Sequence, residues 1–184
     1  MAITLQDIAK YLQAEEFKYE LNVEREVILT GIGKEDQSGA LFIRMKEEGE
    51  MFSLEMEPLK DDESGHFDVP VDHPHILLLL QQMLYANYQT KFGSWEYDPN
   101  DGDLKFTIEF PVEDGTITAK QFQRIISGAF TALESQAVFK KILETGKVPE
   151  DKNQEEQTIK LLEAMLAQVK AGASQESSDD SDGI

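Results

Sequence analysis

The sequence predicts a small α+β domain organised around one central helix. Residues 71–93 contain five consecutive apolar residues, which cover the whole circumference of a helix. Such a helix must bury one side against a sheet and another against a second helix or a second subunit. Apolar and polar residues alternate before it, in 41–46 and 52–57, and after it, in 104–110. This alternation is the period of a strand with one buried face.

Charge and composition restrict the classes of partner. The chain has 17 basic and 36 acidic residues, a net charge of −19. Such a chain repels nucleic acid backbones and anionic lipid headgroups, so we expect no nucleic acid partner and no membrane insertion. Basic or amphipathic polypeptides are the favoured partners. The alternative is that the charge only keeps the protein dispersed.

The sequence also restricts the chemistry and the compartment. The absence of cysteine excludes disulfides, thiolate catalysis and iron–sulfur clusters. Residues 1–16 do not have the pattern of a signal peptide, and the longest apolar run, 76–80, is far shorter than the ~20 residues of a transmembrane helix. We therefore expect a cytoplasmic protein.

The first elements are a short helix and one or two strands. Thr4 and Asp7 resemble a capping box at the start of a helix. Residues 17–23 then alternate, and a second apolar group follows at 27–32. This region predicts either one long bent strand or a hairpin through 24–26.

Two further strands precede the central helix. The composition of 33–39 predicts a turn. Strands at 41–46 and 52–57 are joined by a reversal at 47–50, and 58–65 predict a loop that leads to the helix.

The central helix has possible start and stop residues. Asp72 or His73 can cap its free amide groups, and Pro74 fits the first turn, where its missing N–H has no consequence. Gly93 is positioned to end it.

A hairpin follows the central helix. Trp95 and Tyr97 lie on one side of the first strand, 98–103 supply an acidic turn, and 104–110 form the second strand. The Asp-Gly dipeptide in the turn tolerates positive φ.

The C-terminal part predicts two helices and a tail. Thr118 and Gln121 form a capping box, and the helical pattern continues to Gly146. We divide the chain into a domain at 1–147, a linker with an amphipathic helix at 148–171, and an acidic, serine-rich disordered tail at 172–184.

The order of these elements resembles the YbjN-like family, whose fold is that of the type III secretion chaperones. The resemblance is closest in 92–133, FGSWEYDPNDGDLKFTIEFPVEDGTITAKQFQRIISGAFTAL, and covers most of 5–146. It implies an antiparallel sheet of about five strands packed against helices, in the order α-β-β-β-α-β-β-α. It also implies a homodimer that holds other polypeptides, and it supplies no catalytic residues.

Two apolar surfaces are candidates for protein interaction. On the central helix, the excess apolar residues form a dimer seam unless the last helices cover them. The C-terminal stripe either packs on the domain or binds a partner. The first set is Leu77, Leu80, Leu84 and Tyr88, and the second is Ile159, Leu162, Leu166 and Val169.

Candidate chemistry is limited to three histidines. His66, His73 and His75 are possible metal ligands, although zinc usually needs three or four convergent ligands and these residues also suit a helix start or a surface. The sequence has no other catalytic constellation and no cofactor motif.

The main hypothesis is therefore a non-enzymatic, chaperone-like binding protein. One alternative is an assembly or regulatory factor that binds a larger complex through its C-terminal helix. A second alternative is a metal- or small-ligand-dependent enzyme that uses the histidines.

Overall fold

The computed structural model of the protein describes residues 3–34, 37–59 and 67–149. The chain divides into two compact units, Met1–Val148 and Pro149–Ile184, and the helices and strands named here belong to the first. They are α1 (Leu5–Ala14), β1 (Tyr19–Asn22), β2 (Val27–Lys34), β3 (Gln37–Lys46), the 3₁₀ turn η1 (Glu47–Gly49), β4 (Met51–Pro58), α2 (Ile76–Gln89), β5 (Ser94–Tyr97), β6 (Leu104–Pro111) and α3 (Ala119–Thr145).

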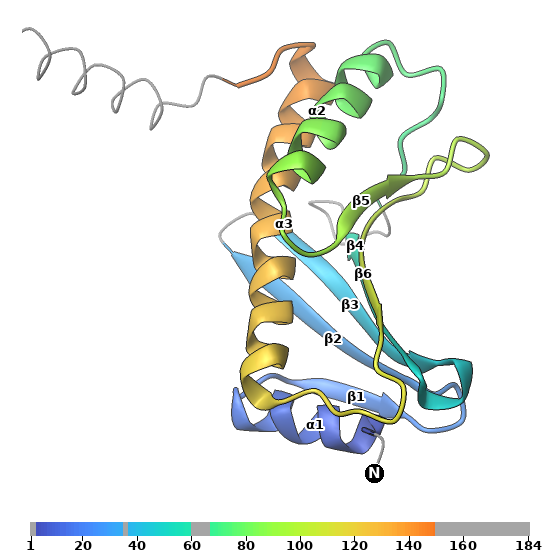
Figure 1. The fold of residues 1–184 in the computed structure, drawn as a ribbon. Coiled ribbons are helices and arrows are strands. Elements are labelled where there is room, and N and C mark those ends of the chain that lie inside the picture. Colours follow the sequence, from blue (N-terminus) through green and yellow to red (C-terminus); the bar gives the residue numbers. More distant parts are fainter. Residues whose placement is uncertain (1–2, 35–36, 60–66, 150–184) are drawn as a thin grey trace, which may run out of the picture. The chain divides into compact units, whose positions relative to one another are not determined.

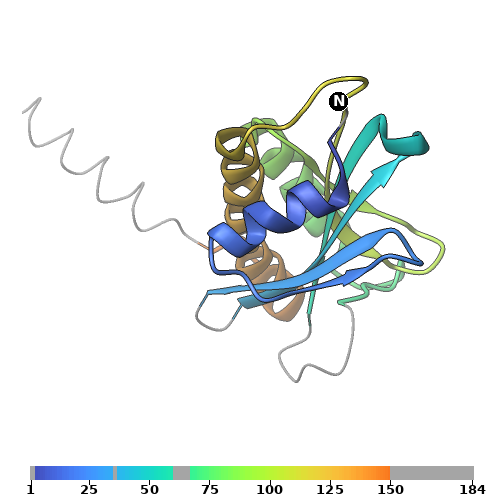
Figure 2. The same cartoon turned by 90° about the horizontal axis from the view of Figure 1, so that it is seen from below.

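The predicted α+β class is confirmed. The strands form one antiparallel sheet in the order β1-β2-β3-β4-β6-β5, and the helices lie on one of its faces (Figures 1 and 2). The sheet has six strands rather than about five, because the region that the sequence left open is a hairpin. Asn22 pairs with Val27, and the turn between them places Glu26 at a φ of 50°. No glycine marks this turn, so composition alone did not reveal it.

The predicted turn at 33–39 was too wide. The β2–β3 ladder continues to the pair of Lys34 and Gln37, which leaves only 35–36, outside the described residues, for the turn. Gly39 lies within β3, at a position where the neighbouring strand β4 leaves little room for a side chain. A Cβ there would lie 2.9 Å from the sulfur of Met56.

The β5–β6 hairpin is confirmed with the predicted alternation. Trp95 pairs with Phe106, and the Asp98 N–H donates to the Asp103 carbonyl at 3.0 Å. Gly102 has a φ of +84°, and a Cβ there would lie 2.6 Å from the carbonyl oxygen of Val69. The glycine thus allows both the turn and the approach of the segment before α2.

The core lies between the inner face of the sheet and the helices. Alternate residues of β4 and β6, among them Phe52, Leu54 and Phe106, are buried, as is the inner side of α3. The Trp95 and Phe139 rings meet at 4.9 Å between centroids, which joins β5 to α3. The alternation seen in the sequence therefore defines the inner face.

The outer face of the sheet carries an ion-pair cluster on β3, β4 and β6, beside the apolar pair of Leu29 and Phe42. The Lys46 ammonium lies 2.6 Å from the Glu109 carboxylate and 3.1 Å from that of Glu55, which also pairs with Arg44 at 3.0 Å. The hydrogen bond to Glu109 raises the pKa of Lys46, and the same bond lowers the pKa of Glu109. The charged part of this face is adapted to water.

Both capping boxes are confirmed. The Thr4 hydroxyl accepts from the Asp7 N–H, the Thr118 hydroxyl accepts from the Gln121 N–H, and both reciprocal bonds are present. Gly146, at a φ of 66°, ends α3 as predicted. Among the described residues, no helix is both long enough and apolar enough to cross a membrane.

The predicted ends of α2 were wrong. The helix begins at Ile76, after a turn in which the Ile76 N–H donates to the His73 carbonyl at 3.0 Å, and no side chain caps it. Pro74 and His75 belong to that turn and not to the helix. The helix ends at Gln89, because the backbone of Thr90 is extended. Gly93 instead fits against β6, where a Cβ would lie 2.6 Å from the Phe106 ring.

Candidate protein-interaction surface

α2 contains no charged residue. Its 14 residues read ILLLLQQMLYANYQ, in a chain of which 29% is charged. Surface helices normally carry charged residues on the side that faces water. Only Leu79 and Met83 of α2 are buried, so burial does not account for this composition.

Four large apolar side chains of α2 are exposed to solvent, Leu77, Leu84, Tyr85 and Tyr88, and three of them lie in one row. Leu77 is 80% exposed, Leu84 71% and Tyr88 85%. Their spacings of seven and four residues place them in one row along the helix, which we call the α2 face. The prediction that α2 packs one side against the sheet and another against a second helix is confirmed by its contacts with β5 and α3. α3 and β5 cover two sides and leave this row open.

A groove of about 560 Å³ lies between α2 and β5. We call it the α2–β5 groove, and no residue that lines it is charged. Leu80, the fourth residue predicted on α2, is half-buried and lines this groove. The full lining is Val71, Ile76, Leu77, Leu80, Met83, Leu84, Asn87, Trp95, Tyr97 and Pro99.

Hydrogen bonds fix the walls of the groove. The Asn87 side-chain amide donates to the Trp95 carbonyl at 3.1 Å, and the Trp95 N–H donates to the Asn87 Oδ1 at 2.7 Å. The Tyr97 hydroxyl donates to the Val69 carbonyl at 2.9 Å. α2, β5 and the segment before α2 are thereby held together, so the groove is preformed.

Three carboxylates lie near one end of the groove. Burial raises the pKa of Tyr97, and the negative charges of Asp98, Asp101 and Asp72 raise it further. Tyr97 lines the groove together with Val71, and its hydroxyl is bonded to Val69 in the segment that leads to α2. The groove is thus apolar along its length and acidic at this end.

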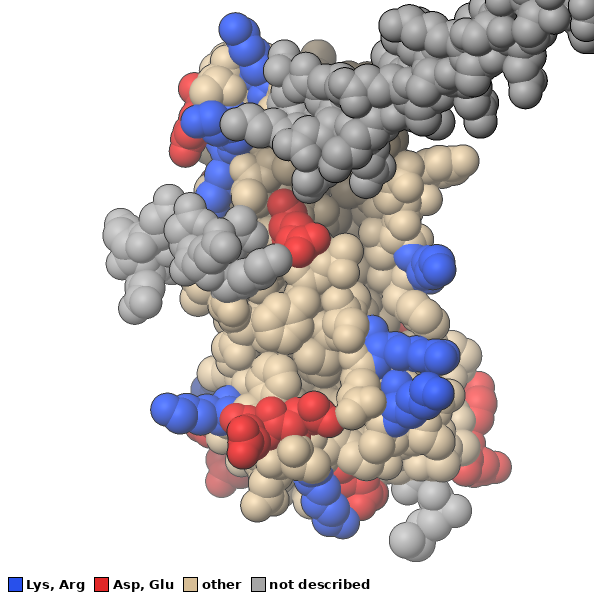
Figure 3. Space-filling view, turned by 90° about the vertical axis from the view of Figure 1, so that its left-hand side faces the viewer, with Lys and Arg blue, Asp and Glu red and all other residues tan. Residues whose placement is uncertain are grey.

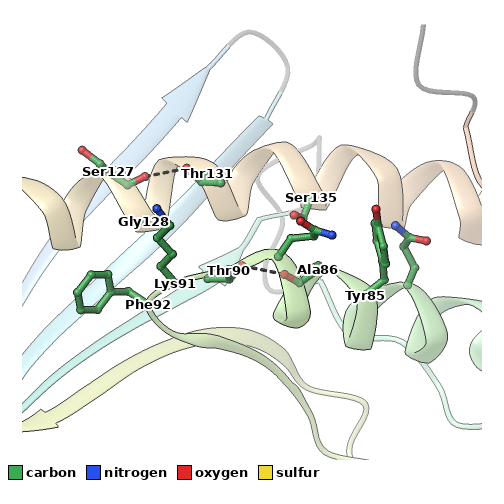
Figure 4. A pocket seen from close by; sticks show the side chains of 11 residues that line it. Tyr85, Ala86, Thr90, Lys91, Phe92, Ser127, Gly128, Thr131 and Ser135 are labelled. Carbon is green, nitrogen blue, oxygen red and sulfur yellow. Dashed lines mark hydrogen bonds between the residues drawn. The ribbon is translucent and has the colours of Figure 1, made fainter. Parts of the chain in front are cut away.

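A second hollow of about 420 Å³ separates α2 from α3. Figure 4 shows Lys91 extending toward Gly128 of α3, and Lys91 is the one charged residue of the lining. The hydroxyls of Thr90 and Thr131 donate to helix carbonyls, those of Ala86 and Ser127. These hydroxyls are engaged in local bonds, and the lining offers no acid–base pair.

The uncharged character extends beyond this hollow. On the side of the molecule that presents α3, the middle is largely free of charge and most charged side chains lie toward the edges (Figure 3).

The histidines are only partly described. The rings of His73 and His75 lie 5.6 Å apart between centroids, and the His75 N–H donates to the His73 Nδ1 at 3.2 Å. The His75 ring packs against Gly146. Within 3–34, 37–59 and 67–149, no group of three or more His, Cys, Asp or Glu side chains is placed to hold a metal. His66 lies outside the described residues, so the three-histidine site stays a prediction.

The second predicted stripe is also outside the described residues. It comprises Ile159, Leu162, Leu166 and Val169. Sequence reasoning missed the wall of the groove outside α2, which consists of Val71, Trp95, Tyr97 and Pro99. One hint was Asn87, a weak helix former within an apolar helix.

Comparison with known protein families and sequences assigns this chain to no family. No protein-family model matches the chain, and no curated protein sequence matches it. The resemblance to the YbjN-like family therefore stays a prediction.

Proposed function

We propose that this protein is a non-enzymatic, chaperone-like binding module that holds a partner polypeptide on the α2 face. The observation that carries the proposal is the row of Leu77, Leu84 and Tyr88, exposed on a helix without charge. A contiguous apolar patch on a protein surface commonly marks an interaction site. The preformed groove beside it extends the same surface.

The distribution of charge supports a polypeptide partner. Burying a carboxylate in an interface carries a desolvation cost unless the charge is paired. The α2 face has no carboxylate to desolvate, while the acidic remainder of the protein keeps a complex in solution. A second copy of the chain is one possible occupant, as the resemblance to YbjN-like proteins implies. Cytoplasmic location also belongs to this proposal.

The test is affinity purification of the tagged protein from its native cells. The variant Leu77→Ser/Leu84→Ser removes two exposed side chains of the α2 face, so we expect it to fold. The matched control is Val23→Ser/Leu29→Ser, which removes two exposed apolar side chains outside α2. Thermal unfolding checks that each variant is folded.

We expect the wild type and the control to retain one or two polypeptides in near-stoichiometric amounts, or to form a homodimer. The α2 variant should lose them. Equal retention by both variants would contradict the proposal, as would a wild type that retains no polypeptide and sediments as a monomer.

A further inference from the structure

We infer that the α2–β5 groove takes an amphipathic α-helix with basic residues at its end, rather than an extended strand. This inference rests on the proposed function and names the chemistry of the partner. Three features of the groove support it: its hydrogen bonding, its shape and its charge.

The hydrogen bonding argues against a strand. β5 is an edge strand, and a partner strand would need its free backbone groups. At Trp95 both groups are already bonded to the side chain of Asn87. A strand beside Trp95 would bury its own N–H and C=O groups without partners, which is costly. A helix satisfies these groups internally.

The shape agrees with a helix in a groove. The groove has a volume of about 560 Å³, and Leu77, Leu80 and Leu84 of α2 line it. Leu77 and Leu84 of α2 are two helical turns apart along its wall. A partner helix can place apolar residues at i, i+4 and i+7 against this spacing.

The charge of the groove favours a partner helix with basic residues at one end. Asp98 Oδ1 accepts from the Asn100 N–H at 2.8 Å, and Asp101 Oδ1 accepts from the Asp103 N–H at 3.0 Å, so the turn fixes both carboxylates. Asp98 lies between Tyr97 and Pro99, and Asp72 follows Val71, so with Asp101 of the same turn they form an acidic end to a groove whose lining is uncharged. Lysine or arginine there gains attraction, whereas a helix with an acidic end is disfavoured by like charge.

Two synthetic helical peptides test the inference with the full-length protein. Both carry leucines at i, i+4, i+7 and i+11. One has two lysines at each end, and the other has two glutamates at each end. A fluorescent dye on each peptide reports binding by anisotropy, because Trp95, which lines the groove, is only 4% exposed before any peptide binds. We expect the lysine peptide to bind about tenfold more tightly or better.

Charge variants separate local recognition from the net charge. Asp72→Asn/Asp98→Asn removes two of the three charges at the acidic end, and asparagine at 98 keeps an oxygen for the Asn100 N–H. The control Glu113→Gln/Asp114→Asn removes the same charge from an exposed turn outside the groove lining. We expect the first variant to lose about fivefold to tenfold in affinity for the lysine peptide and the control to stay near the wild type.

Three outcomes would overturn the inference. Equal losses in both variants would mean that only the net charge acts. Equal affinity for both peptides would show that the groove does not select a partner helix with a basic end. If neither peptide binds while the affinity purification still shows a partner that depends on Leu77 and Leu84, the groove inference fails and the proposed function stands.

Discussion

α2 and α3 are both rich in apolar residues, yet they expose different kinds of side chain to solvent. α3 buries its apolar side, from Phe122 to Ile142, against the sheet and its neighbours, and turns Lys120, Arg124 and Glu144 to water. α2 buries only Leu79 and Met83 and presents apolar residues to water.

This difference shows which of the two helices has its apolar side fully covered within the described domain. An amphipathic helix with a charged outer side needs no further cover. A helix whose outer side is apolar leaves surface that another polypeptide can bury. α3 therefore serves mainly the fold, and α2 serves both the fold and the proposed binding. The predictions below test this division, from the largest effect on stability to the smallest.

The largest effect is expected for Phe139→Ala in α3. Phe139 is fully buried and its ring packs against Trp95. Its removal leaves a cavity and should lower the free energy of unfolding by about 3–5 kcal/mol. Urea denaturation followed by circular dichroism measures this. A loss of less than about 1 kcal/mol would mean that α3 does not anchor the core.

Asn87→Ala should have the next largest effect. It leaves the Trp95 N–H and carbonyl without their side-chain partner, so we expect a loss of about 1–3 kcal/mol. The matched control is Gln89→Ala, an exposed polar residue at the end of α2, which should change stability little. Similar losses in both variants would show that the bonds to β5 are unimportant.

Thr118→Ala removes the N-terminal cap of α3. Loss of the bond from the Gln121 N–H should reduce stability by about 1 kcal/mol. Thr116→Ala, at an exposed threonine just before the cap, is the control. Chemical denaturation distinguishes the two, and the assignment of the cap fails if Thr116→Ala is the more harmful change.

Leu84→Ala should leave stability within about 0.5 kcal/mol of the wild type, because its side chain is mostly exposed. Leu133→Ala, at a fully buried leucine of α3, should cost about 2–5 kcal/mol in the same assay. If Leu84→Ala were as destabilising as Leu133→Ala, α2 would serve the fold alone.

The smallest effect concerns the capping box of α1. Hydrogen bonds from Lys10 and Thr4 lower the pKa of Asp7 from 3.8 to about 2. A lowered pKa means that the carboxylate stabilises the helix start above about pH 4 and that this contribution is lost as the pH falls through about 2. NMR titration of the Asp7 carboxyl checks this. A midpoint near 3.8 would contradict the bonded carboxylate, and Asp7→Asn should remove the transition.

Local patterns predicted most of the fold. The alternation of Leu104, Phe106 and Ile108 and the pairing of Thr118 with Gln121 depend on neighbours in sequence, so one chain segment suffices to predict them. The β1–β2 hairpin was left open because its turn uses a glutamate at positive φ in place of a glycine. Rules of composition do not anticipate that choice.

The candidate site was predicted only in part. The excess of leucine showed that α2 had more apolar surface than one interface needs, and Leu77, Leu84 and Tyr88 are indeed exposed. The groove depends on the approach of β5, which Asn87 fixes through a contact between elements. Hydrophobic periodicity within one element carries no information about such a contact.

Site-specific photocrosslinking in native cells tests the central claim most directly. A benzophenone amino acid replaces Tyr88 on the α2 face, and in separate samples Val23 or Arg124, which are exposed outside α2. We predict that the probe at position 88 forms a discrete adduct with another polypeptide and that the probes at 23 and 124 do not. Adducts only at 23 or 124, or none at 88, would contradict the assignment of the α2 face as the binding surface.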